Sequence, residues 1–407
     1  MARKAKRDMT IEQKLAHGPI DLPFLALVMI LVAVGLIMLL SASFASAMYD
    51  LNPDVDTGGD PMYYFNRQFG FAVLGVIAMF IVSKIDYQRF RLLSVPALVG
   101  SILLLVLIFT PLGHESNGAR RWLWLGISFQ PSEVAKVGVI MYFAARLSKR
   151  NTQLGPPKKW NRRTSLGRLL EKLDNIGFLE LVPYGIIILI VLFLLYLQPH
   201  MSAMILIVAA AASVLFASGI SLGWFAAAGT LVAGALIVII TQTDYMTARI
   251  VIWQDPFSDP RGDGCQPIQS QIAIGSGGLL GTGLGHSRQK YLFLPEEHND
   301  YIFSIVCEEL GMVGAIVIMA LFALLIIRGY WLAIHARDRF GTLLIVGIVS
   351  LTGMQVFFNI GVVTGFLPPT GISLPFFSYG GTALMIQLAE MGMVLSVSRQ
   401  IAAPKAE

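Results

Sequence analysis

Long apolar runs separated by short polar stretches dominate this chain. Runs near the roughly 20 residues that a helix needs to cross a bilayer predict about ten transmembrane helices. The first four are expected at about 22–48, 67–84, 93–112 and 134–147. The fifth and sixth meet at 198–200, the seventh ends near 241, and the last three lie at about 301–327, 342–366 and 379–397. The pattern therefore predicts an all-α polytopic membrane protein.

The longest polar interruption lies between the predicted spans seven and eight, over residues 242–300. It ends in EEHND (296–300), directly before the next apolar run. Carboxylates and an imidazole at the edge of hydrocarbon are costly to place, which favours a functional role. Partial desolvation would raise the pKa of Asp300 and make this carboxylate a usable general base. The alternative is structural, since Asn299 or Asp300 could cap the following helix.

A second group of charged residues precedes the fourth predicted span. Lys136 lies about one turn inside an apolar run, and Glu133, three residues earlier, could neutralise it in a salt bridge. The alternative is that Lys136 and the Arg120-Arg121 pair bind a phosphate or pyrophosphate. Arg67, at the external start of the second span, could join them.

Two segments rich in glycine or proline predict irregular backbone within the membrane region. Residues 275–285 lack the GK[ST] of a phosphate-binding loop and predict close backbone packing or a re-entrant segment. The prolines and glycines of 368–381 predict a broken segment that lines a cavity. No spacing of His, Cys or carboxylates describes a zinc site, and no nucleophile elbow is present.

Composition and charge support the membrane class and add an orientation. The chain has 407 residues, 55% of them hydrophobic and 14% charged, which excludes a water-soluble globular protein. The net charge of +5 does not indicate nucleic acid, because the basic residues gather in particular loops. The positive-inside rule places both termini and the basic segment 148–177 in the cytoplasm, and the 242–300 loop outside.

The expected organisation is a cytoplasmic segment 1–21, a ten-span domain 22–399 and a cytoplasmic tail 400–407. No cleavable signal peptide is expected. Leucines at helical spacing in 166–176 predict a helix lying on anionic lipid, with partner docking as the alternative. Cys265 and Cys307 are expected to be free thiols.

Three motifs, in this order, closely resemble the SEDS family (shape, elongation, division and sporulation). They are GARRWLWLGISFQPSEVAK (118–136), SRQKYLFLPEEHNDYIFSIVCEELG (287–311) and NIGVVTGFLPPTGISLPFFSYGG (359–381). The resemblance implies a peptidoglycan glycosyltransferase that polymerises lipid II outside the cytoplasmic membrane. The motifs look most like the division and sporulation branch, with the elongation branch second.

The resemblance also implies residue roles. PEEHND matches the family's PExHTD, which makes Asp300 the expected general base. The family's cationic positions carry over to Arg67, Arg121 and Lys136, and its tryptophan to Trp122. The full set expected to bind substrate is Arg67, Arg120, Arg121, Trp122, Gln130, Glu133, Lys136, Lys290, Glu297, His298 and Ser378. No cofactor is required and no metal ligand is assigned, although a divalent cation (Mg or Mn) could assist.

The chain departs from the family pattern at three places, one of which is Asn299 in place of the usual Thr. Gln198-Pro199-His200 stands where many members have QPD, and Thr370 where some division members have Lys. The implied partners are lipid II, a class B penicillin-binding protein transpeptidase and other division proteins. Two other functions fit a cavity with basic contacts: a lipid II flippase, and a division scaffold that recruits the transpeptidase.

Overall fold

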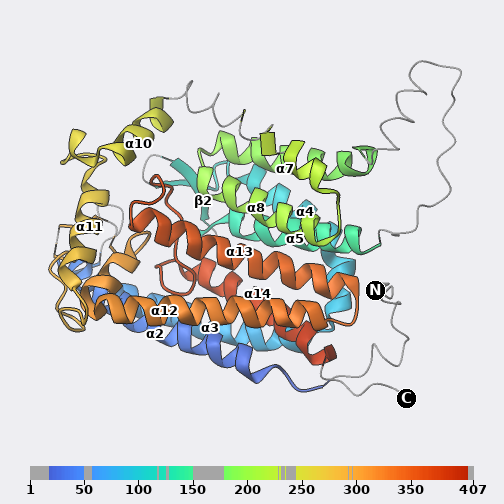
Figure 1. Cartoon of the computed structure of the whole chain (residues 1–407), viewed down its shortest axis with the longest axis horizontal. Coiled ribbons are helices and arrows are strands. Elements are labelled where there is room, and N and C mark those ends of the chain that lie inside the picture. The colour runs from blue at the N-terminus through green and yellow to red at the C-terminus, as the bar shows by residue number, and fades with distance from the viewer. Residues whose placement is uncertain are drawn as a thin grey trace, which may run out of the picture.

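The structure is a computed structural model, viewed along its shortest axis in Figure 1. It describes residues 18–49, 57–116, 119–124, 128–149, 178–227, 229–230, 234, 244–291, 293–295 and 297–401. The predicted interfacial helix at 166–176 and most of the predicted seventh span lie outside the described residues.

Long helices run beside one another along the longest axis of the molecule (Figure 1). They are α2 (Leu22–Met48), α3 (Tyr63–Lys84), α4 (Tyr87–Leu107), α5 (Pro131–Ser148), α7 (Phe178–Leu197), α8 (Met201–Ala217), α12 (Ile302–His335), α13 (Arg339–Val363) and α14 (Gly381–Ile401). Within the described residues, six of these helices are long and apolar enough to span a membrane, while α7 and α8 contain shorter apolar helices. A mostly helical protein with several membrane-crossing helices is thus confirmed, and the count of about ten stays a prediction.

The all-α expectation is wrong between α4 and α5, where an antiparallel sheet forms. Its strands are β1 (Gly113–Ser116), β2 (Ala119–Trp124) and β3 (Ser128–Phe129), in the order β1-β2-β3. Two tryptophans give β2 the aromatic content that favours strands. Leu123 of β2 is buried while Trp124 is exposed, as the alternation of a strand requires.

The glycine-rich segment 277–283 packs into a break in α12. Gly311 has φ 66° and ψ −172°, so the helical hydrogen bonding is interrupted there. Backbone amides and carbonyls of the segment replace the missing bonds, over 2.9–3.1 Å. Thr282 and Gly283 donate to Glu308 and Glu309 carbonyls, and Met312 and Val313 donate to those of Gly278 and Leu279. The predicted close backbone packing of these glycines is confirmed.

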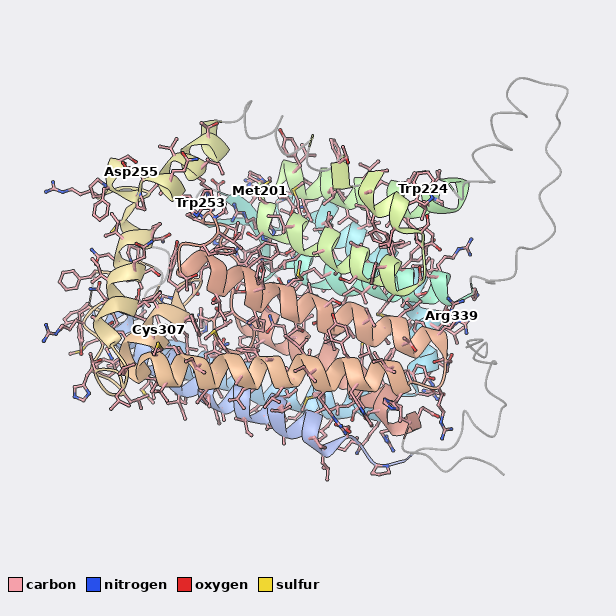
Figure 2. All side chains as sticks on the ribbon, viewed as in Figure 1. Met201, Trp224, Trp253, Asp255, Cys307 and Arg339 are labelled. Atoms are coloured by element: carbon pink, nitrogen blue, oxygen red, sulfur yellow. The ribbon has the colours of Figure 1, made fainter. Side chains whose placement is uncertain are left out.

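Between residue 244 and α12, the described chain contains three further elements, all at one end of the bundle. They are α10 (Asp244–Gln254), the short 3₁₀ helix η1 (Pro256–Ser258) and α11 (Cys265–Gly277). Figure 2 labels Asp255 and Cys307 at this end and Arg339, the first residue of α13, at the other.

The described chain begins and ends at the Arg339 end of the bundle. The amide of Gly18 donates to the carbonyl of Arg399 over 2.9 Å, and Asp21 forms an ion pair of 2.5 Å with Arg328. The side of the membrane that this end faces stays a prediction from the basic residues.

We expect Gly281→Ala to destabilise the fold more than the matched change Gly285→Ala. Both glycines have positive φ, 78° and 83°, which costs a residue with a Cβ about 1–2 kcal/mol. A Cβ on Gly281 would also lie 2.1 Å from the Glu309 carbonyl oxygen, whereas one on Gly285 meets nothing within 4 Å. Thermal unfolding in detergent measures both variants, and equal midpoints would contradict the insertion of this segment into α12.

Candidate functional site

Residues 297–300 form a turn that leads into α12, and two later parts of the chain hold its backbone. Three consecutive carbonyls of this turn each accept a hydrogen bond. Tyr379 N donates to His298 O over 2.9 Å, Ser378 Oγ to Asn299 O over 2.7 Å, and Asn359 Nδ2 to Asp300 O over 2.7 Å. The turn, called the acid turn below, is therefore fixed by α13 and by the segment before α14.

The half-buried carboxylate of Asp300 faces the loop at 370–371. Gly371 has φ +67°, and a Cβ there would lie 3.2 Å from Asp300 Oδ2 and 3.9 Å from Ser202 Oγ. Ser202, at the start of α8, donates to the Thr370 carbonyl over 2.6 Å. The N-cap of α12 is Tyr301, whose side chain makes no capping hydrogen bond.

Aromatic rings surround the buried side chains of Glu297 and His298. The His298 ring lies 4.5 Å from the Tyr64 ring and 5.9 Å from the Tyr379 ring, measured between centroids. Its Nδ1 is 3.6 Å from Glu297 Oε1. Burial raises the pKa of Tyr379, an effect that the positive charge of Arg67 opposes.

Helix α3 supports the segment before α14, which in turn holds the acid turn. Gln68 donates to the Ser378 carbonyl and accepts from the Gly380 amide, both over 3.2 Å. The neighbouring Arg67 is exposed, and its Nη1 donates to the Tyr63 hydroxyl over 2.5 Å. Arg67 therefore lies on the surface beside the acid turn, while Ser378 is built into the backbone clasp.

A second cluster gathers at the start of α5. Lys136 Nζ and Glu133 Oε2 are 2.7 Å apart and both side chains are buried, which confirms the expected salt bridge. Arg121, on β2, donates to the Pro199 carbonyl over 2.7 Å. Gln130 Nε2 lies 3.4 Å from His200 Nε2. We call these residues the cation cluster.

His200 is a neutral member of the cation cluster. Burial, together with the positive charges of Arg121 and Lys136, lowers its pKa to about 3. An uncharged ring thus occupies the position at which an acid would be expected from the SEDS resemblance. Glu390, buried on α14, lies within electrostatic reach of Lys136 and Glu133.

Two expected substrate ligands lie apart from both clusters. Arg120 forms a 3.7 Å ion pair with Glu115, and both side chains are more than half exposed. It precedes Arg121 on β2 at a register shift of the β1–β2 pair, and the two side chains have different partners, Glu115 for Arg120 and the Pro199 carbonyl for Arg121. Lys290 donates to Ser41 Oγ, Gly285 O and Glu309 Oε1 over 2.8–3.1 Å, which occupies all three of its donors. This geometry favours a structural role for Lys290, and its role in binding substrate stays a prediction.

The start of α8 joins the two clusters. His200 belongs to the cation cluster, and Ser202, two residues later, reaches the loop that contacts Asp300. An acid that can accept a proton and cations that can stabilise an anion therefore lie on two sides of one helix terminus.

Trp122 is half-buried on β2. In the described part of the chain, no group of three or more His, Cys, Asp or Glu side chains could hold a metal ion.

Several structural partners of the site were missed by the sequence reasoning. Asn359 and Glu390 are polar residues inside apolar runs, a signal that could have found them because such residues are costly in a membrane. Arg249, on α10, donates to the Pro369 carbonyl over 2.5 Å next to the loop at 370–371. Burial raises the pKa of Tyr301, the charge of Asp300 raises it further and that of Arg249 opposes both. Nothing in the sequence marks this position of Arg249.

Comparison with known proteins finds similarity along almost the whole chain. Residues 22–403 match the family profile FTSW_RODA_SPOVE, described as "Cell cycle protein". The chain is 38% identical over 383 residues to the "Probable peptidoglycan glycosyltransferase FtsW" of Geobacter metallireducens, covering 94% of this chain and 95% of the relative. It is 37% identical over 381 residues to stage V sporulation protein E of Bacillus subtilis, covering 93% and 97%.

Solved structures share the fold. One is a chain from work on the coordination of polymerization and crosslinking by a peptidoglycan synthase complex. It has a TM-score of 0.69 and 29% identity, and the match covers 94% of this chain and 98% of that one. The rod shape determining protein RodA of Thermus thermophilus has a TM-score of 0.62 and 28% identity, covering 93% and 97%.

We expect His200→Gln to make the stability of the protein less sensitive to acid. Unfolding returns the His200 pKa from about 3 to about 6.5, so the unfolded state takes up a proton as pH falls below 6.5. This uptake destabilises the wild type by about 2 kcal/mol between pH 7 and pH 5. Thermal unfolding in detergent at the two pH values measures the difference. An equal acid sensitivity in the variant would contradict a neutral buried ring.

Proposed function

The chain belongs to the FtsW, RodA and SpoVE family of cell cycle proteins, and we propose from that membership that it is a peptidoglycan glycosyltransferase. It polymerises lipid II into glycan strands at the outer face of the cytoplasmic membrane during cell division and releases undecaprenyl pyrophosphate. The observation that supports this reaction best is the placement of an acid and of two cations, Arg121 and Lys136, near the start of α8.

In this proposal Asp300 is the general base. The 4-hydroxyl of an acceptor lipid II attacks the anomeric carbon of the donor chain, and the hydroxyl proton passes to the Asp300 carboxylate. The bond between the anomeric carbon and the pyrophosphate oxygen breaks, with inversion. The clasp on the Asp300 carbonyl and the close approach of Gly371 hold this carboxylate in place, so little reorganisation precedes proton transfer.

The leaving pyrophosphate gains negative charge as the bond breaks, and the cations stabilise that charge. Arg121 and Lys136 are held near the start of α8. A low dielectric at this place would strengthen their interaction with an anion. Arg67, at the surface beside the acid turn, contacts the same group from α3. A divalent cation could add to this stabilisation without being required.

The proposed partner is a class B penicillin-binding protein transpeptidase, together with other division proteins. Its support is the structural similarity to a chain of a complex that coordinates polymerization and crosslinking. The protein would lie in the cytoplasmic membrane at the septum with both termini inside. An elongation polymerase like RodA is the nearest alternative, and a flippase for lipid II the alternative from another class. Cations serve both tasks, whereas a positioned external carboxylate favours the enzyme.

We expect Asp300→Asn to lower the rate of glycan polymerisation about 10²–10⁴-fold, because the amide cannot accept the hydroxyl proton. The measurement uses purified lipid II and protein in detergent, each variant with its cognate transpeptidase. Binding of lipid II by the variant is the control for folding. Equal rates for the variant and the wild type would move the base to another residue, and flipping without polymerisation would favour the transporter.

The neighbouring arginines of β2 provide a matched pair for the leaving-group role. We expect Arg121→Gln to lower the polymerisation rate about 10²-fold, as loss of one donor to a developing anion does in other enzymes. Arg120→Gln removes an exposed side chain paired with Glu115 and should change the rate less than about twofold, in line with a surface ion pair. The same assay measures both variants, and similar losses in the two would argue against a leaving-group role specific to Arg121.

A further inference from the structure

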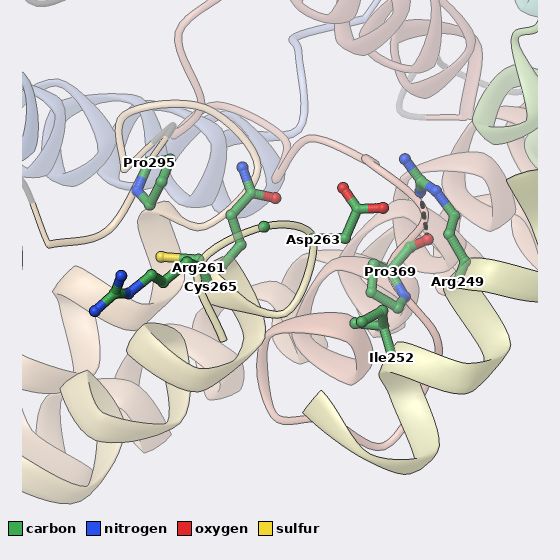
Figure 3. Close-up of a pocket in the computed structure, with 9 residues that line it drawn as sticks. Arg249, Ile252, Arg261, Asp263, Cys265, Pro295 and Pro369 are labelled. Carbon is green, nitrogen blue, oxygen red and sulfur yellow. Dashed lines mark hydrogen bonds between the residues drawn. The ribbon is translucent and has the colours of Figure 1, made fainter. Parts of the chain in front are cut away.

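A cavity of about 320 Å³ lies between α10 and the segment that leads into α11 (Figure 3). Its lining includes two arginines, Arg249 and Arg261, the carboxylate of Asp263, the amide of Gln266 and the thiol of Cys265. The reaction proposed above uses none of these side chains. A volume of this size is at the lower end of the range for sites that bind small ligands.

The charges of the cavity indicate the chemistry of its ligand. Figure 3 shows Arg249 and Arg261 at opposite ends of the lining, with Asp263 between them. A guanidinium binds a carboxylate through two parallel hydrogen bonds, and the Asp263 carboxylate suits an ammonium group. The same carboxylate repels a doubly charged phosphate. The arrangement therefore fits a peptide that carries both carboxylates and an amine.

One loop joins this cavity to the acid turn. Pro369 forms part of the cavity wall, and its carbonyl accepts the hydrogen bond of Arg249. Two residues later, Gly371 lies against the carboxylate of Asp300. Asp300 and Arg249 also both act on the hydroxyl of Tyr301. A sugar bound at Asp300 could therefore place an attached chain in the cavity.

We propose that the cavity binds the peptide of lipid II, with peptide carboxylates at Arg249 and Arg261 and the peptide amine at Asp263. The inference rests on the proposed function, since it takes the peptide from that substrate. It makes the cavity a specificity site, because lipid-linked sugars without the peptide would lose these contacts while keeping those of the acid turn and the cation cluster.

Cys265 provides a direct test of occupancy. The sequence contains two cysteines, of which Cys265 is half-buried in the cavity lining and Cys307 is buried on α12. The rate of maleimide alkylation at Cys265, followed by mass spectrometry on the full chain in detergent, therefore reports on the cavity. Lipid II at about ten times its Kd should slow this alkylation about tenfold. The lipid-linked disaccharide pyrophosphate without peptide should not slow it.

A matched pair of variants tests the arginine contact. Arg261→Gln should raise the lipid II concentration needed for half protection about tenfold or more, as expected for the loss of a charged hydrogen bond. Arg288→Gln removes the same charge from an exposed position between α11 and α12, outside the cavity lining, and should leave protection unchanged. Equal effects of the two variants would overturn the proposal.

Three outcomes separate this proposal from the proposed function. Asp300→Asn should abolish polymerisation and keep the peptide-dependent protection. The wild type could make strands while lipid II fails to protect its Cys265, or while the peptide-free lipid protects Cys265 equally well. Either result would overturn the cavity proposal and leave the polymerase assignment in place. Protection by the transpeptidase alone, without lipid II, would also overturn it and assign the cavity to a protein contact.

Discussion

The backbone carbonyls of the acid turn need hydrogen-bond partners where the turn joins the helix bundle. The geometry of the site depends on which residues supply those partners. Buried carbonyls without partners are costly, and the three carbonyls of residues 298–300 find theirs in distant parts of the chain. Asn359 couples two of these parts, because its amide donates to the carbonyls of Asp300 and Ile372, each over 2.7 Å. The position of Asp300 therefore depends on α13 and on the segment before α14.

The approach to the acid turn is fixed by a second set of contacts, at the break in α12. The carboxylate of Glu308 accepts from the Ser287 hydroxyl and from the Arg288 amide, and that of Glu309 accepts from Ser41 and Lys290. Two buried acids thus tie the 287–290 loop to α12, and Lys290 neutralises one of them. Removing one partner of such a pair leaves an uncompensated buried charge. Lys290 therefore stays inside the protein with its donors occupied, although it lies in one of the three motifs that resemble the SEDS family.

Features set by local pattern could be predicted from the sequence, and those set by long-range pairing could not. The apolar runs, the polar loop before Asp300, the close packing of its glycines and the Lys136–Glu133 pair all follow from spacing along one segment. The small sheet that carries Arg120 and Arg121 depends on pairing between strands, and the hydrophobic pattern gave no sign of it. Ser41, one partner of Lys290, and the side-chain donors to the acid turn lie 59 to 249 positions away, a separation that no spacing rule bridges.

His200 reports the electrostatic potential that an anionic leaving group would meet. Burial alone disfavours the charged imidazolium, and the charges of Arg121 and Lys136 disfavour it further, so the ring stays neutral. The field that repels a proton from His200 attracts an anion at the same place. An aspartate at this position would be paired with these cations and would offset part of their charge before substrate arrives. A neutral ring adds no such negative charge beside Arg121 and Lys136, and fixed cations are the kind of group that can stabilise a developing anion.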